Sequence, residues 1–237
     1  MNRRLYAIHR WLSAIALVQL AAWTLSGLFF AVVPSTTLKG SPVEHANEAT
    51  LDADLDVVPP SRILKTLEPR GHVSKLTLAG APAGVFYTAT VGSARVRLDA
   101  RTGAERPVDA NEAAAAARRD QPSAPPVVST EVVASPPPLE YRDKPLPAWR
   151  VTLADGRGTV VYVDAVTAEV TARRNDVWRV YDFLWALHIM DYRGREDFRH
   201  PLLVAAASLG LLTVASGCVL WGTRLVRRWR GRRKTFA

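Results

Sequence analysis

Cysteine is nearly absent from this chain of 237 residues, which contains a single one, Cys218. Because Cys218 lies in an apolar run near the end of the chain, residues 34–199 contain no cysteine and can form no disulfide. That part must therefore be stable through its own hydrophobic core, which a segment of this length can supply. We read a lone cysteine inside an apolar run as a small packing residue rather than a reactive thiol.

Familiar catalytic motifs are missing as well. The sequence has no H-E-x-x-H, no paired cysteines at zinc spacing, no G-x-S-x-G, no G-x-G-x-x-G and no P-loop. It therefore gives no sign of zinc hydrolysis, serine hydrolysis or nucleotide binding. Any electrons that the protein handles must come from a partner protein or from a quinone.

Charged residues are missing from two long stretches, residues 11–33 and 201–222. At about 1.5 Å per helical residue, each can cross the ~30 Å hydrocarbon core of a bilayer. The first stretch exceeds the h-region of a signal peptide and no A-x-A site follows it, so we expect an uncleaved helix. The sequence thus predicts two transmembrane helices, and the lack of a charge within either argues against a proton or ion pathway.

The formal net charge of +9 comes wholly from the two ends of the chain. Basic residues precede the first apolar run and follow the second, whereas all 22 acidic residues lie between the runs. By the positive-inside rule, both termini are expected in the cytoplasm and the middle part is expected to be exported. The basic tail can contact anionic lipid headgroups. Because no basic face interleaved with aromatic residues is present, nucleic acid is excluded as a partner.

The middle part reads as an α+β domain built from two similar halves. A short helix beginning near Pro59 is followed by three stretches that alternate apolar and polar residues, as antiparallel strands do. A second helix, with Asp109 as N-cap and Glu112 at the capping-box position, begins the second copy. That copy continues with a strand, a proline-rich insertion that cannot be a central strand, and a hairpin around Asp155-Gly156.

The two copies share one ending. In each, a strand ends in aspartate, and a threonine and a glutamate follow at similar spacing: Asp99, Thr102 and Glu105, then Asp164, Thr167 and Glu169. The pattern predicts a turn in which the aspartate and threonine side chains bind nearby backbone N–H groups before the next strand begins. We assign these residues a structural role.

Small residues form a stripe on each predicted transmembrane helix. The stripes are His9, Ser13, Ala16, Leu20 and Gly27 on the first, and Ala206, Gly210, Thr213 and Gly217 on the second. Small residues let helix backbones approach closely in lipid. The stripes are therefore expected to pack the two helices together or to pack a dimer, and a cofactor slot between the helices is the alternative.

An aromatic-rich segment, residues 176–192, leads back to the second apolar run and predicts an interfacial helix. His188 within this segment and His200 after it flank a short charged loop. At helical spacing, His188 shares a face with Tyr181 and Trp185. We therefore expect the His188 ring to lie against an aromatic wall.

These patterns resemble a known family. A helix and three strands ending in D-x-x-T-[GA]-x-E resemble the PepSY domain. The sequence L-x-x-I-H-R-W-L, with Leu5, His9, Trp11 and Leu12, is similar to the entry of the PepSY-associated transmembrane family. So is F-L-W-A-L-H-I-M-D-Y…H-P-L-L, with His188, Asp191 and His200. The resemblance covers nearly the whole chain.

The resemblance implies a bacterial inner-membrane protein whose PepSY modules are periplasmic. Larger members of this family have more helices, and some are similar to ferric-siderophore or flavin-linked reductases that carry haem b on histidines. This chain has only two predicted spans and few histidines. It could therefore restore a four-helix bundle only by forming a dimer.

The candidate haem ligands implied by the resemblance are His188, His200 and His9, and no other metal is expected. Because the two edges of a bilayer are about 30 Å apart, His9 cannot ligate the same iron as the other two. We expect His188 and His200 to serve one external haem, and His9 to serve a second site only with a histidine of another subunit. The alternative is that interfacial histidines and aromatics anchor the helices at the headgroups.

The predicted fold class is a membrane α+β protein, with two transmembrane helices flanking a periplasmic domain of two PepSY-like repeats, each a helix plus three antiparallel strands. The expected organisation is a cytoplasmic N-terminus (1–10), a first transmembrane helix (11–33), a linker (34–58), two repeats (59–108 and 109–175), an interfacial helix and loop (176–199), a second transmembrane helix (200–222) and a basic cytoplasmic tail (223–237).

Three functions remain open at this point. The first is a haem-b redox subunit in iron or siderophore reduction, which would make the chain part of an oxidoreductase. The second is a non-enzymatic periplasmic module that binds and regulates an envelope protein, and the third is an accessory subunit of an envelope complex. The expected partners are the lipid bilayer, a second copy or a larger membrane complex, and a periplasmic protein or a ferric siderophore.

Overall fold

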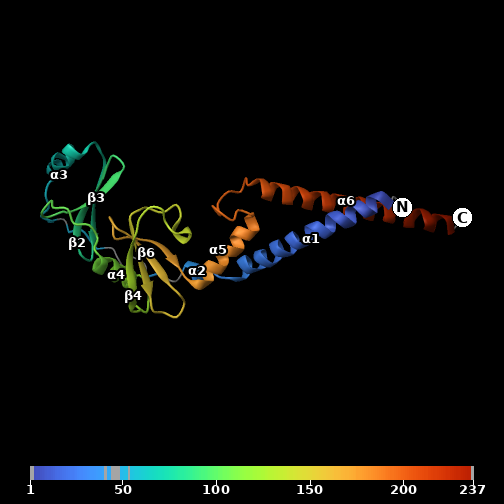
Figure 1. The fold of residues 1–237 in the computed structure, drawn as a ribbon, viewed down its shortest axis with the longest axis horizontal. Helices are drawn as coiled ribbons and strands as arrows, with labels where there is room; N and C mark the ends of the chain where they lie inside the picture. The colour runs from blue at the N-terminus through green and yellow to red at the C-terminus, as the bar shows by residue number, and fades with distance from the viewer. Residues whose placement is uncertain (1–2, 40–41, 44–48, 53, 236–237) are drawn as a thin grey trace. The chain divides into compact units, whose positions relative to one another are not determined.

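The computed structural model describes residues 3–39, 42–43, 49–52 and 54–235 (Figure 1). These residues fall into two compact units. The first, which we call the helical unit, consists of residues 1–34 and 180–237. The second, which we call the central unit, consists of residues 35–179.

The helical unit contains two long helices, α1 (Arg3–Val32) and α6 (Pro201–Thr235). Both are long and apolar enough to cross a membrane, so each of the two predicted apolar runs forms one continuous helix. They pack side by side, and His9 near the start of α1 contacts Ser216 near the middle of α6. Figure 1 shows the start of α1 beside the late part of α6, so the two helices run antiparallel.

Both long helices extend beyond the predicted spans. α1 begins at Arg3 rather than at residue 11, and α6 continues through the stretch predicted only as a basic tail. Arginine and lysine are good helix formers, and a helix that has already begun adds further residues at little cost. Hydropathy marks the part of each helix that fits a bilayer, not the ends of the helix itself.

A shorter helix, α5 (Asp176–Ile189), precedes α6 and corresponds to the predicted aromatic-rich helix. The Asn175 side chain caps its start by accepting a hydrogen bond from the Trp178 backbone N–H at 2.7 Å. At its end, the Trp23 indole of α1 donates to the His188 carbonyl at 2.7 Å. The indole thereby satisfies one of the carbonyls that a helix end leaves without a partner.

The first half of the central unit is one helix on one face of a three-stranded sheet. After a short helix α2 (Ser35–Lys39), its elements are α3 (Pro60–Leu67), η1 (Glu68–Arg70), β1 (Val73–Ala81), β2 (Gly84–Val91) and β3 (Ala94–Asp99). The strands are antiparallel in the order β1-β2-β3. Ile63 and Leu67 of α3 are buried against Tyr87 and Leu98 of the sheet. The predicted helix and three strands are thus present.

The second half has the same plan with one strand more. Its elements are α4 (Ala110–Arg119), β4 (Val127–Val133), η2 (Leu139–Tyr141), β5 (Ala148–Leu153), β6 (Val160–Asp164) and β7 (Val170–Arg174). They form an antiparallel sheet in the order β4-β5-β6-β7. The fourth strand, β7, corrects the expected three: it pairs with β6 directly after the shared turn. In the first half, the equivalent pairing is a single bridge between Leu98 and Glu105.

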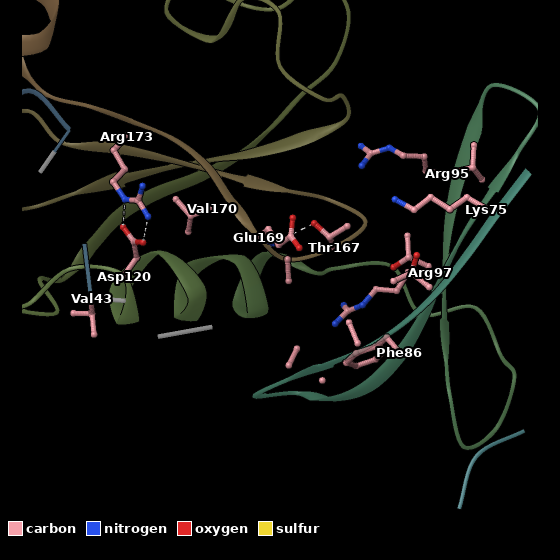
Figure 2. Close-up of a pocket in the computed structure, with 17 residues that line it drawn as sticks. Val43, Lys75, Phe86, Arg95, Arg97, Asp120, Thr167, Glu169, Val170 and Arg173 are labelled. Atoms are coloured by element: carbon pink, nitrogen blue, oxygen red, sulfur yellow. Dashed lines mark hydrogen bonds and ion pairs between the residues drawn. The ribbon is translucent and has the colours of Figure 1, made fainter. Parts of the chain in front are cut away.

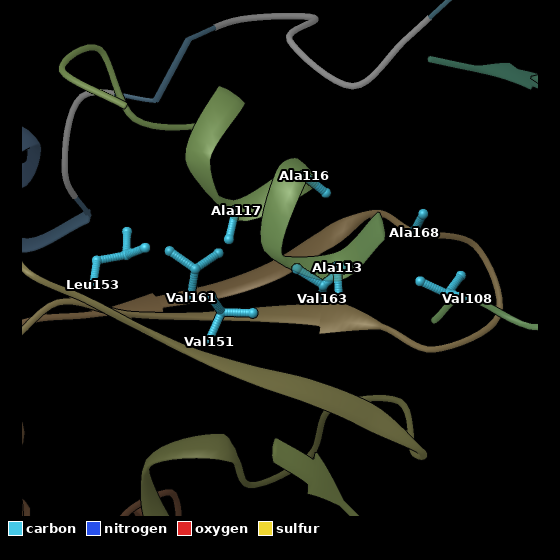
Figure 3. Close-up of a cluster of buried hydrophobic side chains, with 9 residues drawn as sticks. All are labelled: Val108, Ala113, Ala116, Ala117, Val151, Leu153, Val161, Val163 and Ala168. Carbon is cyan, nitrogen blue, oxygen red and sulfur yellow. The ribbon is translucent and has the colours of Figure 1, made fainter. Parts of the chain in front are cut away.

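The core of the second half lies between α4 and its sheet. Figure 3 shows the alanines of α4 facing valines of β5 and β6. Five of these residues have no exposed surface: Ala113, Ala117, Val151, Val161 and Val163. Small alanines on the helix let its backbone lie close to the sheet, so this core is thin but closely packed.

The proline-rich insertion covers the other face of the second sheet. Tyr141 of η2 is buried there and stacks on Tyr162 at 4.3 Å between ring centroids. Because both faces are covered, all five residues of β6 are buried. The prediction that the insertion is not a central strand is confirmed.

The shared turn has the same hydrogen bonds in both halves. Asp99 Oδ1 accepts from the N–H groups of Arg101 and Thr102 at 2.9 and 3.0 Å. Asp164 Oδ1 accepts from those of Val166 and Thr167 at 2.8 and 3.0 Å. In each turn the threonine hydroxyl accepts from the N–H two residues later. The predicted structural role of this pattern is confirmed.

Candidate functional site

His188 is the histidine that the structure ties most closely to another helix. Its Nδ1 lies 2.8 Å from the hydroxyl oxygen of Ser26 on α1. Ser26 is fully buried, and its hydroxyl also donates to the Ala22 carbonyl at 2.7 Å. The sequence predicted His188 as a site residue but gave no hint of this serine.

The Ser26 hydroxyl can hold the His188 ring in one tautomer. A serine hydroxyl has a single proton, and the carbonyls of Ala22 and Trp23, at 2.7 and 3.2 Å, lie within its reach as well as His188 Nδ1. When that proton goes to the Ala22 carbonyl, the oxygen accepts from His188, so Nδ1 carries the ring proton and Nε2 carries a lone pair. Metal-binding histidines are commonly held in this way, with one ring nitrogen donating to the protein and the other free to ligate.

His9 repeats this arrangement near the other end of α1. Its Nδ1 lies 2.7 Å from the hydroxyl of Ser216 on α6, and that hydroxyl donates to the Thr213 carbonyl at 2.9 Å. When the Ser216 proton goes to that carbonyl, Nδ1 of His9 is the protonated nitrogen and Nε2 carries the lone pair. The Ser13 hydroxyl lies 3.5 Å from Nε2, which is a long contact.

The two serine-held rings are far apart. His9 and Ser26 are 17 residues apart on one continuous helix, which places them about 25 Å apart along its axis. The expectation that His9 and His188 cannot share one iron therefore agrees with the geometry. The helical unit holds two separate candidate ligands, one toward each end of the α1–α6 pair.

His200 is held differently from the other two. It precedes α6, its carbonyl accepts from Leu203 and Val204, and its Nδ1 accepts from the Leu202 N–H at 3.4 Å. Because Nδ1 is an acceptor here, the proton of a neutral ring lies on Nε2. Among the described residues, no hydrogen bond or ring contact joins His200 to His188, so their expected pairing on one haem stays a prediction.

An aromatic wall surrounds His188, as its helical spacing predicted. Phe30 of α1 lies 5.5 Å from the His188 ring, 4.8 Å from Tyr181 and 5.9 Å from Trp185 between centroids. Trp23 lies 6.2 Å from the His188 ring on another side. An apolar aromatic setting of this kind is what a haem macrocycle packs against.

The loop between α5 and α6 is built around Asp191. Its buried carboxylate accepts hydrogen bonds from the backbone N–H groups of Arg193, Gly194, Glu196 and Asp197 at 3.0–3.2 Å. Burial by itself raises the pKa of Asp191, but the four N–H groups outweigh it and hold the pKa well below its usual value. The carboxylate thus stays ionised and fixes the loop that follows His188.

Two further contacts close this loop. The buried carboxylate of Asp182 on α5 pairs with Arg195, and the Trp185 indole donates to the Arg195 carbonyl at 3.1 Å. The Trp185 ring also lies 5.7 Å from Phe198. Asp182 and Arg195 were not singled out by sequence reasoning, because charges near a membrane edge are usually solvated.

A second candidate site is a cavity of about 670 Å³ within the central unit. One wall is the face of the first sheet opposite α3, which carries Lys75, Arg95 and Arg97 (Figure 2). The facing wall includes Glu169 and the ion pair between Asp120 and Arg173. This cavity includes none of the candidate histidines.

Two ion pairs that join the halves involve arginines lining this cavity. Arg97 binds both carboxylate oxygens of Glu112, at 2.7 and 3.0 Å, and Arg95 binds Asp164 at 2.7 Å. Glu112 was expected only as a capping-box residue. The Asp109 cap is present, with its side chain accepting from the Glu112 N–H at 2.8 Å, but the Glu112 carboxylate is used across the two halves.

The remaining candidate ligands do not gather into a metal site. Within the described part of the chain, no group of three histidine, cysteine, aspartate or glutamate side chains could hold a metal ion. Cys218 lies exposed on α6, in keeping with a residue that faces lipid.

Comparison with known proteins supports one assignment. A family model described as the PepSY-associated TM region matches residues 6–237. Searches among proteins of curated function and among solved structures gave no significant match. Because the family model covers nearly the whole chain, including both long helices and both sheets, this protein belongs to the PepSY-associated TM family.

Proposed function

We propose that this protein is an inner-membrane redox subunit that carries haem b and takes part in iron or siderophore reduction. His188 and His9 are its axial ligands, one for each of two sites. The observation that carries this proposal is the pair of serine-held rings. In the proposal, Ser26 and Ser216 each accept a hydrogen bond from Nδ1, which lies 2.8 and 2.7 Å away, and this leaves Nε2 with the lone pair that haem iron requires.

The residues around His188 fit such a group. Haem b, when bound, supplies one-electron redox chemistry. Ser26 holds the ring in one orientation and one tautomer, and Phe30 with Trp185 offers apolar surface that excludes water. Asp191 fixes the loop beyond His188 through four backbone hydrogen bonds.

The second axial ligand of each site is proposed to come from a second copy of the chain. One serine-held histidine is present toward each end of the α1–α6 pair, and among the described residues no hydrogen bond or ring contact joins His200 to His188. A bis-histidine site therefore needs the same ring from another copy, which makes the active form a homodimer or a larger membrane complex.

The charge distribution supports an orientation for the two sites. With both basic ends of the chain in the cytoplasm, His9 lies toward the cytoplasmic side and His188 toward the periplasmic side. Electrons would enter from a partner protein or a quinone and would leave toward a periplasmic iron compound. The central unit would then be periplasmic.

An absorption spectrum of the detergent-purified chain with added haem tests this proposal. We expect a Soret band that His188→Ala weakens strongly and that His72→Ala leaves unchanged. His72 lies exposed before β1 and is the matched control for the same change of side chain. A wild-type chain without a Soret band would contradict the proposal, and so would equal loss in the two variants.

The cavity of the central unit favours a second candidate function. A polar cavity of about 670 Å³ is within the size range of ligand-binding sites. A non-enzymatic periplasmic binding or regulatory module, or an accessory subunit of an envelope complex, would use this cavity and would need no haem. This candidate predicts no Soret band, together with ligand binding that His188→Ala does not change.

A further inference from the structure

The uncovered face of the first sheet carries two rows of polar side chains. Strand pairing places Thr90 of β2 opposite Lys75 of β1 and Arg95 of β3. The next row on the same face is Thr77, Thr88 and Arg97. All six side chains line the cavity of the central unit.

Only some of these groups are satisfied by the protein. Arg97 is fully engaged with Glu112, and Arg95 gives one nitrogen to Asp164 and one to the Leu146 carbonyl at 3.4 Å. Within the described residues, the ammonium of Lys75 and the hydroxyls of Thr77, Thr88 and Thr90 have no protein partner. The row that contains Lys75 therefore has one cation without a counter-ion beside a hydroxyl.

The spacing of the strands leaves room for one ligand carboxylate between Lys75 and Arg95. Adjacent strands lie about 4.8 Å apart, so Lys75 and Arg95 stand about 10 Å apart at the backbone with Thr90 midway between them. Their long side chains can converge above Thr90. A carboxylate there would accept from the ammonium, the guanidinium and the hydroxyl together, and charge-assisted hydrogen bonds of this kind are the strong ones.

The other polar groups of the cavity favour neutral hydroxyl groups on a ligand over a second negative charge. Thr77 and Thr88 can each donate or accept a hydrogen bond. On the facing wall, Glu169 has no ion-pair partner among the described residues (Figure 2). Its carboxylate accepts hydrogen bonds from hydroxyls but repels a second anionic group, so a polyanion is disfavoured.

We propose that this cavity binds a sugar acid, meaning a small molecule with one carboxylate and several hydroxyl groups. The carboxylate lies above Thr90 between Lys75 and Arg95. The hydroxyls face Thr77, Thr88 and Glu169. The cavity volume of about 670 Å³ leaves room for more than one six-carbon unit. The site lies wholly within the central unit, so it does not depend on haem binding.

The test is isothermal titration calorimetry on the detergent-solubilised full chain with three six-carbon probes. Gluconate has the carboxylate and the hydroxyls, sorbitol lacks the carboxylate, and hexanoate lacks the hydroxyls. We expect gluconate to bind at least about tenfold more tightly than either of the others. Equal binding of gluconate and hexanoate, equal binding of gluconate and sorbitol, or no gluconate binding would each overturn the proposal.

Variants of the two rows then locate the site. Lys75→Ala should weaken gluconate binding by about tenfold and leave sorbitol unaffected, and Thr88→Val should reduce the preference for gluconate over hexanoate. Lys65→Ala and Thr66→Val, on the exposed side of α3, are the matched controls. Lys75→Gln, which keeps a polar side chain on β1, serves if the alanine variant does not fold. Unchanged binding in the row variants, or an equal effect of the controls, would overturn the assignment to this cavity.

Discussion

At the scale of single residues, two serines contact the ring nitrogens of His188 and His9. A histidine between two helices can be a simple packing residue, with either tautomer populated. In the proposed arrangement, Ser26 and Ser216 remove that freedom by directing their one proton to a backbone carbonyl of their own helix. The same contact is made at two places about 25 Å apart along α1.

Replacing Ser26 should therefore change the tautomer balance of the His188 ring. In Ser26→Ala, Nδ1 loses its acceptor at 2.8 Å, and both tautomers should become populated. Nitrogen NMR of the haem-free protein with ¹⁵N-labelled histidine reads this directly. If haem binds, its affinity should also fall by about 10- to 100-fold, as expected when the residue orienting a ligand is lost.

The matched control is Ser208→Ala on α6. Its hydroxyl bonds only to the Val204 carbonyl, at 2.8 Å, and the residue is exposed. We expect no change in either measurement. A single unchanged tautomer in Ser26→Ala would contradict the role of Ser26 even if haem binds, so this result is independent of the proposed function.

Residue patterns that act locally were predictable from sequence, and those that act across helices were not. Asp99 and Asp164 bind N–H groups two and three residues ahead, so their spacing alone predicted the turns. Ser26 and His188 are 162 residues apart. Which polar residue of α1 meets α5 depends on how the helices cross, and one sequence contains no such information.

At the scale of elements, the loop between α5 and α6 depends on the charge of Asp191. The pKa of this carboxyl is lowered on folding, so its contribution to stability is complete above its ordinary value of 3.8 and is lost as the pH falls below that value toward the folded pKa. We expect the loop to be stable at neutral pH and to open in strong acid.

Asp191→Asn should make the stability of the loop independent of pH. The amide keeps one carbonyl oxygen but cannot accept four hydrogen bonds as a carboxylate does, so the loop should be weakened at every pH. Hydrogen exchange of the Gly194 and Glu196 backbone N–H groups measures the stability of the loop, and residues of β6 serve as internal reference. Exchange in the wild type that is insensitive to acid would contradict this account.

The crossing of α1 and α6 depends on the absence of a side chain at Gly217. A Cβ at this position would lie 3.1 Å from Cε1 of His9, which is closer than side-chain contacts usually come. Gly217→Ala should therefore displace the His9 ring and disturb its bond to Ser216. The change should be visible in the His9 nitrogen resonances.

Gly210→Ala is the matched control for this crossing. A Cβ at Gly210 meets nothing within 4 Å, and alanine favours a helix over glycine by about 1 kcal/mol. We expect the thermal stability of the monomer to stay equal or rise slightly. If Gly210→Ala instead impairs only haem binding or dimer formation, the second copy packs at this position.

At the scale of the whole molecule, the sequence predicted more of the helical unit than of the central unit. Hydropathy identified both long helices because burial in lipid requires a long uncharged run. Alternation identified the strands around Tyr87, since one face of the first sheet packs on a helix, and the Asp155-Gly156 turn identified the hairpin that contains Val161. The fourth strand, β7, pairs with β6 across the shared turn and was not predicted. The cavity could not be predicted, because it forms where segments distant in the sequence meet.

The orientation of the whole chain rests on its charge distribution, and the single cysteine makes that testable. In a Cys218→Ala background, Ser93→Cys places a thiol on the exposed turn between β2 and β3, and Arg228→Cys places one on the exposed late part of α6. A thiol reagent that cannot cross membranes should label Ser93→Cys in intact spheroplasts. It should label Arg228→Cys only after the membrane is opened, because the positive-inside rule predicts a cytoplasmic location for the basic end of α6. The opposite pattern would place His9, rather than His188, on the side where iron compounds arrive, and would reverse the direction of electron transfer proposed for this protein.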